Sequence, residues 1–190
     1  NPTYDTVANE LKKYNIMNPA LYPVAIMAVK SLDKEMRSTL PDEIVNCIQM
    51  HAGLSVASSC IPVGGLDVAA LTANIWTMYV RINNKLGISF SENMMKSIGS
   101  AVAANLASNL AISGVGVALK YIPIFGTIAG SVIMGASMYG VTIAAAWIYL
   151  MAIVNWVKKG KGSGDDLKSS VNDVIKQNKN KIDEIIKDAK

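Results

Sequence analysis

The 190-residue chain is 51% hydrophobic and only 17% charged, with a net charge of +4, whereas soluble domains carry about 25% charged residues. So few charges leave little to cover a water-facing surface, and part of the apolar surface is expected to meet lipid or a partner. Residues 158–190 hold nine lysines and six acidic residues, a mixture of signs without an arginine cluster that excludes nucleic acid as an expected partner and suits an anionic membrane surface better.

Residues 1–42 are predicted to form two amphipathic helices. The first covers residues 5–16 and ends at Asn18-Pro19, and the second covers residues 23–38. The chain does not begin with Met and has no signal-peptide pattern, which indicates a portion of a longer protein.

Residues 43–159 are predicted to form a hydrophobic helical core. Its first helix is uncharged from Ile44 onward and is broken by Ile61-Pro62-Val63-Gly64-Gly65. Asp67 opens a second helix over residues 66–86 that Gly87 closes, and Ser89 or Ser91 is expected to cap the third.

Three titratable side chains lie in or near the first helix of this core. His51 is expected to be a core or interfacial histidine, because no second type of metal ligand clusters with it. Cys47 and Cys60 are expected to be buried reduced thiols, with a disulfide between them as the alternative.

The region that decides the interpretation is residues 97–157. Residues 97–119 and 121–157 carry no charge, and Lys120 alone separates these runs of 23 and 37 residues. A bilayer core needs roughly 20 apolar residues in a helix. With Lys120 and Pro123 at the turn, the pattern predicts a hydrophobic hairpin that inserts into lipid; the alternative is a buried pair of core helices in a soluble bundle.

Aromatic and basic residues follow the order of a membrane exit. Near the end of the second arm, aromatic rings are followed at once by lysines, and these side chains prefer the headgroup level and anionic leaflets, respectively. The predicted membrane-interface residues are Lys120, Trp147, Tyr149, Trp156, Lys158, Lys159 and Lys161.

Small residues and helix breakers are predicted to shape the turns and the close approach of helices, as they do in bilayers. The predicted packing and turn residues are Pro62, Gly64, Gly65, Asp67, Pro123, Gly126, Gly130 and Gly135.

The C-terminal region consists of a predicted flexible linker, residues 160–164, and an amphipathic helix over residues 165–190. Apolar residues recur near 3.6-residue spacing in this helix, and helix propensity is interrupted at residues 177–180. The helix is expected to dock on the bundle, lie on the membrane or pair with another chain.

Catalytic and cofactor motifs are missing. The sequence contains no GxxxxGK[ST] loop, HExxH, GxSxG or paired carboxylates, and acidic residues lie mainly near the two ends of the chain. We therefore expect no enzyme activity, no cofactor and no metal.

Two stretches carry a family resemblance: IPVGGLDVAALT at residues 61–72, followed by Met78-Tyr79-Val80, and LKYIPIFGTIAG at residues 119–130. In this order they resemble the YcjF-like family of unknown function, whose hallmark is a K-x-I-P-x-x-G-x-x-x-G turn between hydrophobic helices. Its members often accompany, or are fused to, Era-like GTPase domains. The resemblance covers about residues 55–155 and implies a helical fold and membrane association. No GTPase motif occurs in these 190 residues, so any GTPase would lie upstream or on a separate partner.

Together these patterns predict an all-α bundle of about seven or eight helices around the hydrophobic hairpin 97–157. The expected function is a membrane-associated module at a bacterial inner membrane or its equivalent, or a soluble form able to insert. Its expected partners are an anionic lipid bilayer, a GTPase or other protein, and a second copy of the chain. A colicin-like pore-forming domain and a soluble scaffold that binds a partner protein are the alternatives.

Overall fold

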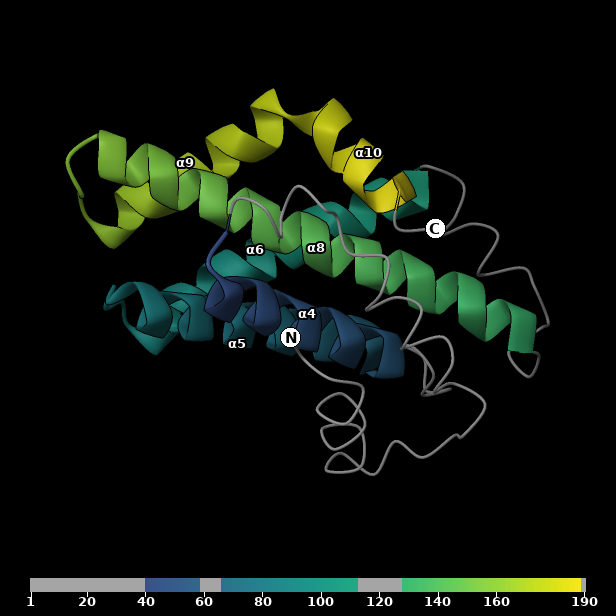
Figure 1. Cartoon of the computed structure of the whole chain (residues 1–190). Helices are drawn as coiled ribbons and strands as arrows, with labels where there is room; N and C mark the ends of the chain where they lie inside the picture. Colours follow the sequence, from purple (N-terminus) through teal and green to yellow (C-terminus); the bar gives the residue numbers. More distant parts are fainter. Residues whose placement is uncertain (1–39, 59–65, 113–127, 189–190) are drawn as a thin grey trace.

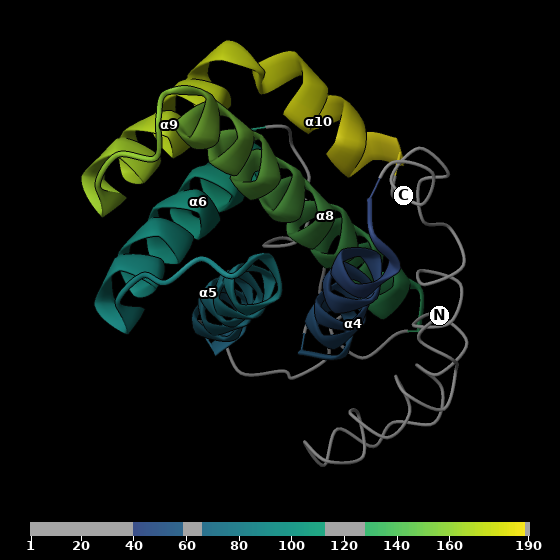
Figure 2. The same ribbon diagram turned by 60° about the vertical axis from the view of Figure 1, so that its left-hand side comes forward.

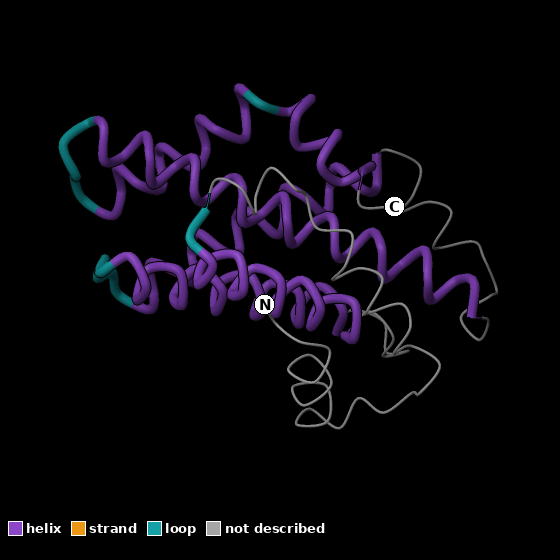
Figure 3. The backbone as a smooth tube through the Cα atoms, in the orientation of Figure 1, coloured by secondary structure: helices purple, strands orange, loops and turns teal. Residues whose placement is uncertain are grey.

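The computed structural model describes residues 40–58, 66–112 and 128–188, and every regular element in these ranges is an α-helix (Figures 1 and 3). The prediction of an all-α chain is confirmed for these residues. The helices predicted within residues 1–42 and the turn containing Lys120 and Pro123 lie outside them, so the predicted total of seven or eight helices stays a prediction. The described helices are α4 (Asp42–Ser58), α5 (Leu66–Leu86), α6 (Glu92–Ile112), α8 (Ile128–Lys158), α9 (Gly164–Gln177) and α10 (Lys179–Asp188).

The bounds of α5 and α6 follow from local chemistry. Gly87 has φ +67°, a left-handed conformation that glycine adopts without a Cβ penalty, and it ends α5 as predicted. The Ser91 hydroxyl accepts the N–H of Met94 at 3.3 Å, so Ser91 rather than Ser89 caps the start of α6.

The α8 helix is the centre of the bundle. It contacts every other described helix, most extensively α4, α9 and α10. Figures 1 and 2 show it between α4 and α5 on one side and α9 and α10 on the other. A helix surrounded in this way must be apolar on nearly all sides, which explains why its sequence lacks the two-faced pattern of a surface helix.

The predicted hairpin of residues 97–157 is not confirmed. Its connection falls outside the described residues, and its two arms, α6 and α8, share only a small contact. The main neighbour of α6 is α5, while α8 packs chiefly on α4 and on the C-terminal helices. Within the described residues, each arm therefore packs mainly against helices other than its predicted mate.

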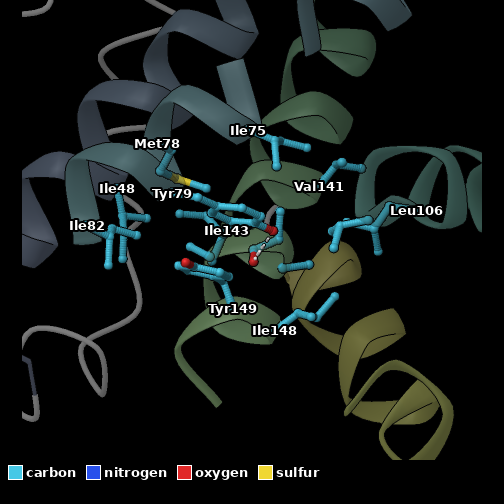
Figure 4. Packing of buried hydrophobic residues seen from close by; sticks show 14 of the residues in the cluster. Ile48, Ile75, Met78, Tyr79, Ile82, Leu106, Val141, Ile143, Ile148 and Tyr149 are labelled. Atoms are coloured by element: carbon cyan, nitrogen blue, oxygen red, sulfur yellow. Dashed lines mark hydrogen bonds between the residues drawn. The ribbon is translucent and has the colours of Figure 1, made fainter. Parts of the chain in front are cut away.

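A tyrosine pair lies in the middle of the core (Figure 4). The rings of Tyr79 on α5 and Tyr149 on α8 stack with centroids 3.9 Å apart and planes 11° from parallel. The Tyr79 hydroxyl donates to the Ala145 carbonyl at 2.9 Å, and the Tyr149 hydroxyl donates to Asn83 Oδ1 at 2.9 Å. Both hydroxyls are thus satisfied where water has no access.

Helices α5 and α6 approach closely because of one glycine. A Cβ added at Gly99 would lie 2.6 Å from the Cβ of Trp76 and 3.0 Å from its Cα. The Lys96 ammonium lies 5.1 Å from the centre of the Trp76 ring, so the edge of the same contact gains a cation–π interaction.

The C-terminal segment forms two helices with a break at Asn178, within the interval 177–180 where the sequence loses helix propensity. Of the predicted linker, residues 160–164, the first four form a defined turn with positive φ at Gly160 and Lys161, and Gly164 begins α9. A capping box follows: Ser163 accepts the N–H of Asp166, and the Asp166 carboxylate accepts from the Ser163 N–H at 2.6 Å. The apolar residues of α9 and α10 that the bundle buries are Leu167, Val171, Val174, Ile182 and Ile186.

Candidate functional site

One helix of the described residues is long and apolar enough to cross a membrane. The stretch Ser137–Lys158 of α8 has 22 residues, and 72% of its most apolar window is buried inside the bundle. At 1.5 Å per residue, 22 residues extend about 33 Å, which matches a hydrocarbon core of about 30 Å. In this structure most of that stretch is covered by protein.

One side of α8 is not fully covered. Five apolar residues near the end of α8 recur at a spacing that places them on this side of the helix. The exposed Lys158 follows directly after them. Val154 and Val157 are each 43% exposed, and the other three are partly buried. We call this set the α8 stripe: Trp147, Leu150, Met151, Val154 and Val157.

Basic residues stand at the C-terminal end of the α8 stripe. Lys158, Lys159 and Lys161 are all exposed. Lys159 Nζ lies 3.9 Å from Asp173 Oδ2 on α9, a distant pair between exposed groups that contributes little stability. The end of α8 therefore presents apolar side chains and cationic groups together at the surface.

The other two predicted interface aromatics lie inside the bundle. Tyr149 is fully buried in the stack with Tyr79, and Trp156 is 7% exposed. The Trp156 indole N–H donates to the carbonyls of Gly162 at 3.0 Å and Ser163 at 3.2 Å, and its ring meets the edge of Phe90. In this structure the Trp156 hydrogen bonds hold the turn between α8 and α9. Of the three aromatics, only Trp147, which is partly buried, belongs to the α8 stripe.

A chain of polar side chains links α8 to the helices that cover it. On α4, His51 Nδ1 lies 2.6 Å from Asn74 Oδ1 of α5, and the Asn74 amide donates to the His51 carbonyl and to Ser55 Oγ, each at 2.7 Å. Ser55 Oγ in turn lies 2.6 Å from Thr142 Oγ1 of α8. We call these four side chains, His51, Ser55, Asn74 and Thr142, the His51 network.

The hydrogen bonds of the His51 network assign the proton on the ring. The Asn74 amide nitrogen is used as a donor to two acceptors, so Asn74 Oδ1 must accept, and His51 Nδ1 carries the hydrogen. His51 Nε2 is then an unprotonated nitrogen, and it is buried without a hydrogen-bond partner among the residues that the structure describes. Burial lowers the pKa of His51 from 6.5 to about 4; the Asn74 hydrogen bond opposes this shift and the charge of Arg81 adds to it.

Other predicted site residues are placed as follows. Asp67 lies in the first turn of α5, and Gly130 and Gly135 lie in α8. Cys47 is a buried free thiol whose pKa is raised by burial. Among the described residues, no three His, Cys, Asp or Glu side chains are grouped as metal ligands. The predicted residues outside the described ranges are Lys120, Cys60, Pro62, Gly64, Gly65, Pro123 and Gly126.

Sequence reasoning missed the features that depend on partners far along the chain. Gly99 was not among the predicted packing glycines, and nothing in its neighbourhood in the sequence reveals that Trp76 lies against it. The links from His51 to Asn74 and from Ser55 to Thr142 join residues 23 and 87 positions apart. The capping box at Ser163 is the exception, because Ser followed by Asp three positions later is a local signal.

Comparison of the chain with family models, with curated proteins and with solved structures finds no match.

Proposed function

We propose that this protein associates with membranes and that α8 is the segment that enters lipid, while the surrounding helices enclose it in water. The observation that carries the proposal is α8 itself, whose 22-residue stretch Ser137–Lys158 has the length and apolarity of a membrane span. A helix suits this task because it satisfies its backbone hydrogen bonds internally, as lipid demands.

The exposed surface of α8 supports first contact with an anionic bilayer. The α8 stripe presents apolar side chains, and Lys158 and Lys161 are exposed beside its end. Each lysine near an anionic leaflet contributes about 1 kcal/mol of attraction, and the apolar side chains gain by leaving water. The stripe is thus suited to dock on lipid before any helix moves.

Full entry of α8 into lipid requires α4, α5, α6, α9 and α10 to leave it. The apolar surface that these helices cover gains as much from lipid tails as from protein, so the exchange costs little in apolar burial. The polar contacts of Thr142 and Tyr149 have to be given up or replaced. Docking through the stripe and insertion of α8 are therefore two separate steps with different costs.

Flotation with liposomes tests the proposal. The full chain is mixed with vesicles of phosphatidylcholine containing 30% phosphatidylglycerol, a composition chosen to be anionic, and centrifuged through a density gradient. We expect wild-type protein to float, and a variant with Lys158, Lys159 and Lys161 changed to Glu to float much less. The same charge change at the exposed Lys176, Lys179 and Lys187 is the matched control and is expected to float more than the first triple variant.

The apolar part of the surface is tested by Val154→Asn with Val157→Asn. Both side chains are 43% exposed, so the pair should leave the free energy of unfolding nearly unchanged while it weakens flotation. Membrane association would be overturned if the protein stayed monodisperse without detergent and did not float with any of the vesicles.

That outcome would favour the second candidate, a soluble helical scaffold for a partner protein, which the burial of 72% of the apolar window also supports. The resemblance to the YcjF-like family suggests a GTPase as that partner protein, or as a protein that acts together with this chain at the membrane. Leakage of a trapped dye from the same vesicles would instead favour the colicin-like pore-forming alternative.

A further inference from the structure

The His51 network connects three helices at one buried point. His51 and Ser55 come from α4, Asn74 from α5 and Thr142 from α8, and their hydrogen bonds measure 2.6–2.7 Å. His51, Ser55 and Thr142 are each no more than 1% exposed. The bonds among His51, Ser55 and Asn74 join α4 to α5, and the contact between Ser55 and Thr142 joins this pair of helices to α8.

His51 is the point at which this connection is sensitive to acid. The network leaves Nε2 as the nitrogen that takes up a proton, and no side chain or backbone group in the described part of the chain pairs with it in its buried position. A proton there creates a buried cation with an unsatisfied N–H, both of which are costly away from water. Any arrangement that opens the ring to water removes that cost.

The charged surroundings act in the same direction. Arg81 on α5 is the charged group that acts on the ring, and it opposes a second positive charge. Cys47 lies one turn earlier on α4 and is a thiol, while α8 contributes the neutral Thr142. The network contains no carboxylate to compensate an imidazolium.

We propose that the His51 network is an acid-sensitive latch, which holds α4 and α5 against α8 at neutral pH and releases α8 when His51 takes up a proton. Its consequence for lipid rests on the function proposed above, because release matters there as the step that frees α8 to insert. The loosening itself is a property of the protein in water and is measurable without vesicles.

The sign and size of the effect follow from the pKa of His51. Closed protein holds this pKa at about 4, whereas a ring in water has the ordinary 6.5, so the open state binds the proton first as pH falls. The closed state keeps its full advantage above pH 6.5 and loses it progressively toward pH 4. Between pH 7.5 and 5 the ratio of closed to open protein falls by about 30-fold, which corresponds to about 2 kcal/mol.

Urea unfolding of the full chain at pH 7.5, 6 and 5 tests the latch. His51 is the only histidine among the 190 residues, so no other side chain has an ordinary pKa between 5 and 8. The comparison is with His51→Gln, which retains an amide that can donate to Asn74 but does not titrate. Between pH 7.5 and 5, we expect the ratio of folded to unfolded protein to fall by about 30-fold in the wild type and by less than about 3-fold in the variant. Parallel losses in the two proteins would overturn the latch.

An NMR titration of the single histidine in the wild-type protein provides a second measurement, which decides the case if the Gln variant does not fold. A His51 pKa below 5 supports the latch, and a value at or above 6.5 overturns it.

Flotation at pH 7.5 and 5 then separates the two proposals. Stronger flotation of wild type at pH 5, without a matching rise for His51→Gln, supports acid release of α8. Equal rises in both proteins would overturn the latch as the control of insertion. If acid destabilises the wild-type protein in water but it floats at neither pH, the latch is supported and the membrane function is overturned.

Discussion

Helix α8 and the pair α9–α10 that follows it have opposite sequence patterns, and the difference shows what each pattern can predict. In α9 and α10 the apolar residues recur near 3.6-residue spacing, and the bundle buries those positions, including Leu167, Val174 and Ile182. In α8 nearly every residue from Tyr139 to Ala146 is apolar, and all eight are buried. The sequence of an amphipathic helix indicates which side packs against the bundle. A helix that is apolar on all sides fits both the centre of a bundle and the interior of a bilayer.

The strongest test of this comparison places a charge on each side of α8. Ala145→Asp puts a carboxylate at a fully buried position among core side chains, and we expect a loss of about 4 kcal/mol or more in the free energy of unfolding. Val154→Asp, on the exposed stripe of the same helix, should change stability by less than about 0.5 kcal/mol. Urea unfolding measures both; equal losses would mean that α8 is not oriented as described.

A second test concerns the close approach of two helices. The sequence predicted packing glycines within residues 126–135, whereas in the structure Gly99 allows α5 and α6 to approach closely. Gly99→Ala drives a methyl group to within 2.6 Å of Trp76, and we expect a loss of about 1–3 kcal/mol as α5 and α6 move apart. The neighbouring Ser100→Ala, exposed on α6, is the control and should be nearly neutral. A neutral Gly99→Ala in thermal unfolding would show that this contact adjusts freely.

The smallest expected effect lies in the turn between α8 and α9. Ser163→Ala removes the hydroxyl that caps α9 and should cost about 1 kcal/mol, whereas Ser169→Ala, exposed within α9, should cost less. Hydrogen exchange of the first α9 amides is the readout, with faster exchange expected only for the cap variant. The Ser163 hydrogen bonds also lower the pKa of Asp166, so the capping box weakens as acid protonates that carboxylate.

Much of the fold was predictable because its signals are local. The ends of α5 at Gly87, the cap at Ser91 and the break near Asn178 each depend on residues within one turn of the chain. The candidate site was less predictable. Trp156 and Tyr149 follow the order of membrane-interface residues, but their hydrogen bonds to Gly162 and Asn83 place both rings inside the bundle.

Sequence alone determined that the chain is helical where it is described, and that one helix carries the apolarity and length of a membrane span, because both depend on composition and spacing along the chain. Only the tertiary structure decided which sides of α8 are enclosed, and that His51 is hydrogen-bonded to Asn74 while its second nitrogen has no partner within the described ranges. Those outcomes depend on which helices, distant in the sequence, pack together. A uniformly apolar segment has no polar side, so its sequence does not indicate which of its sides will be covered.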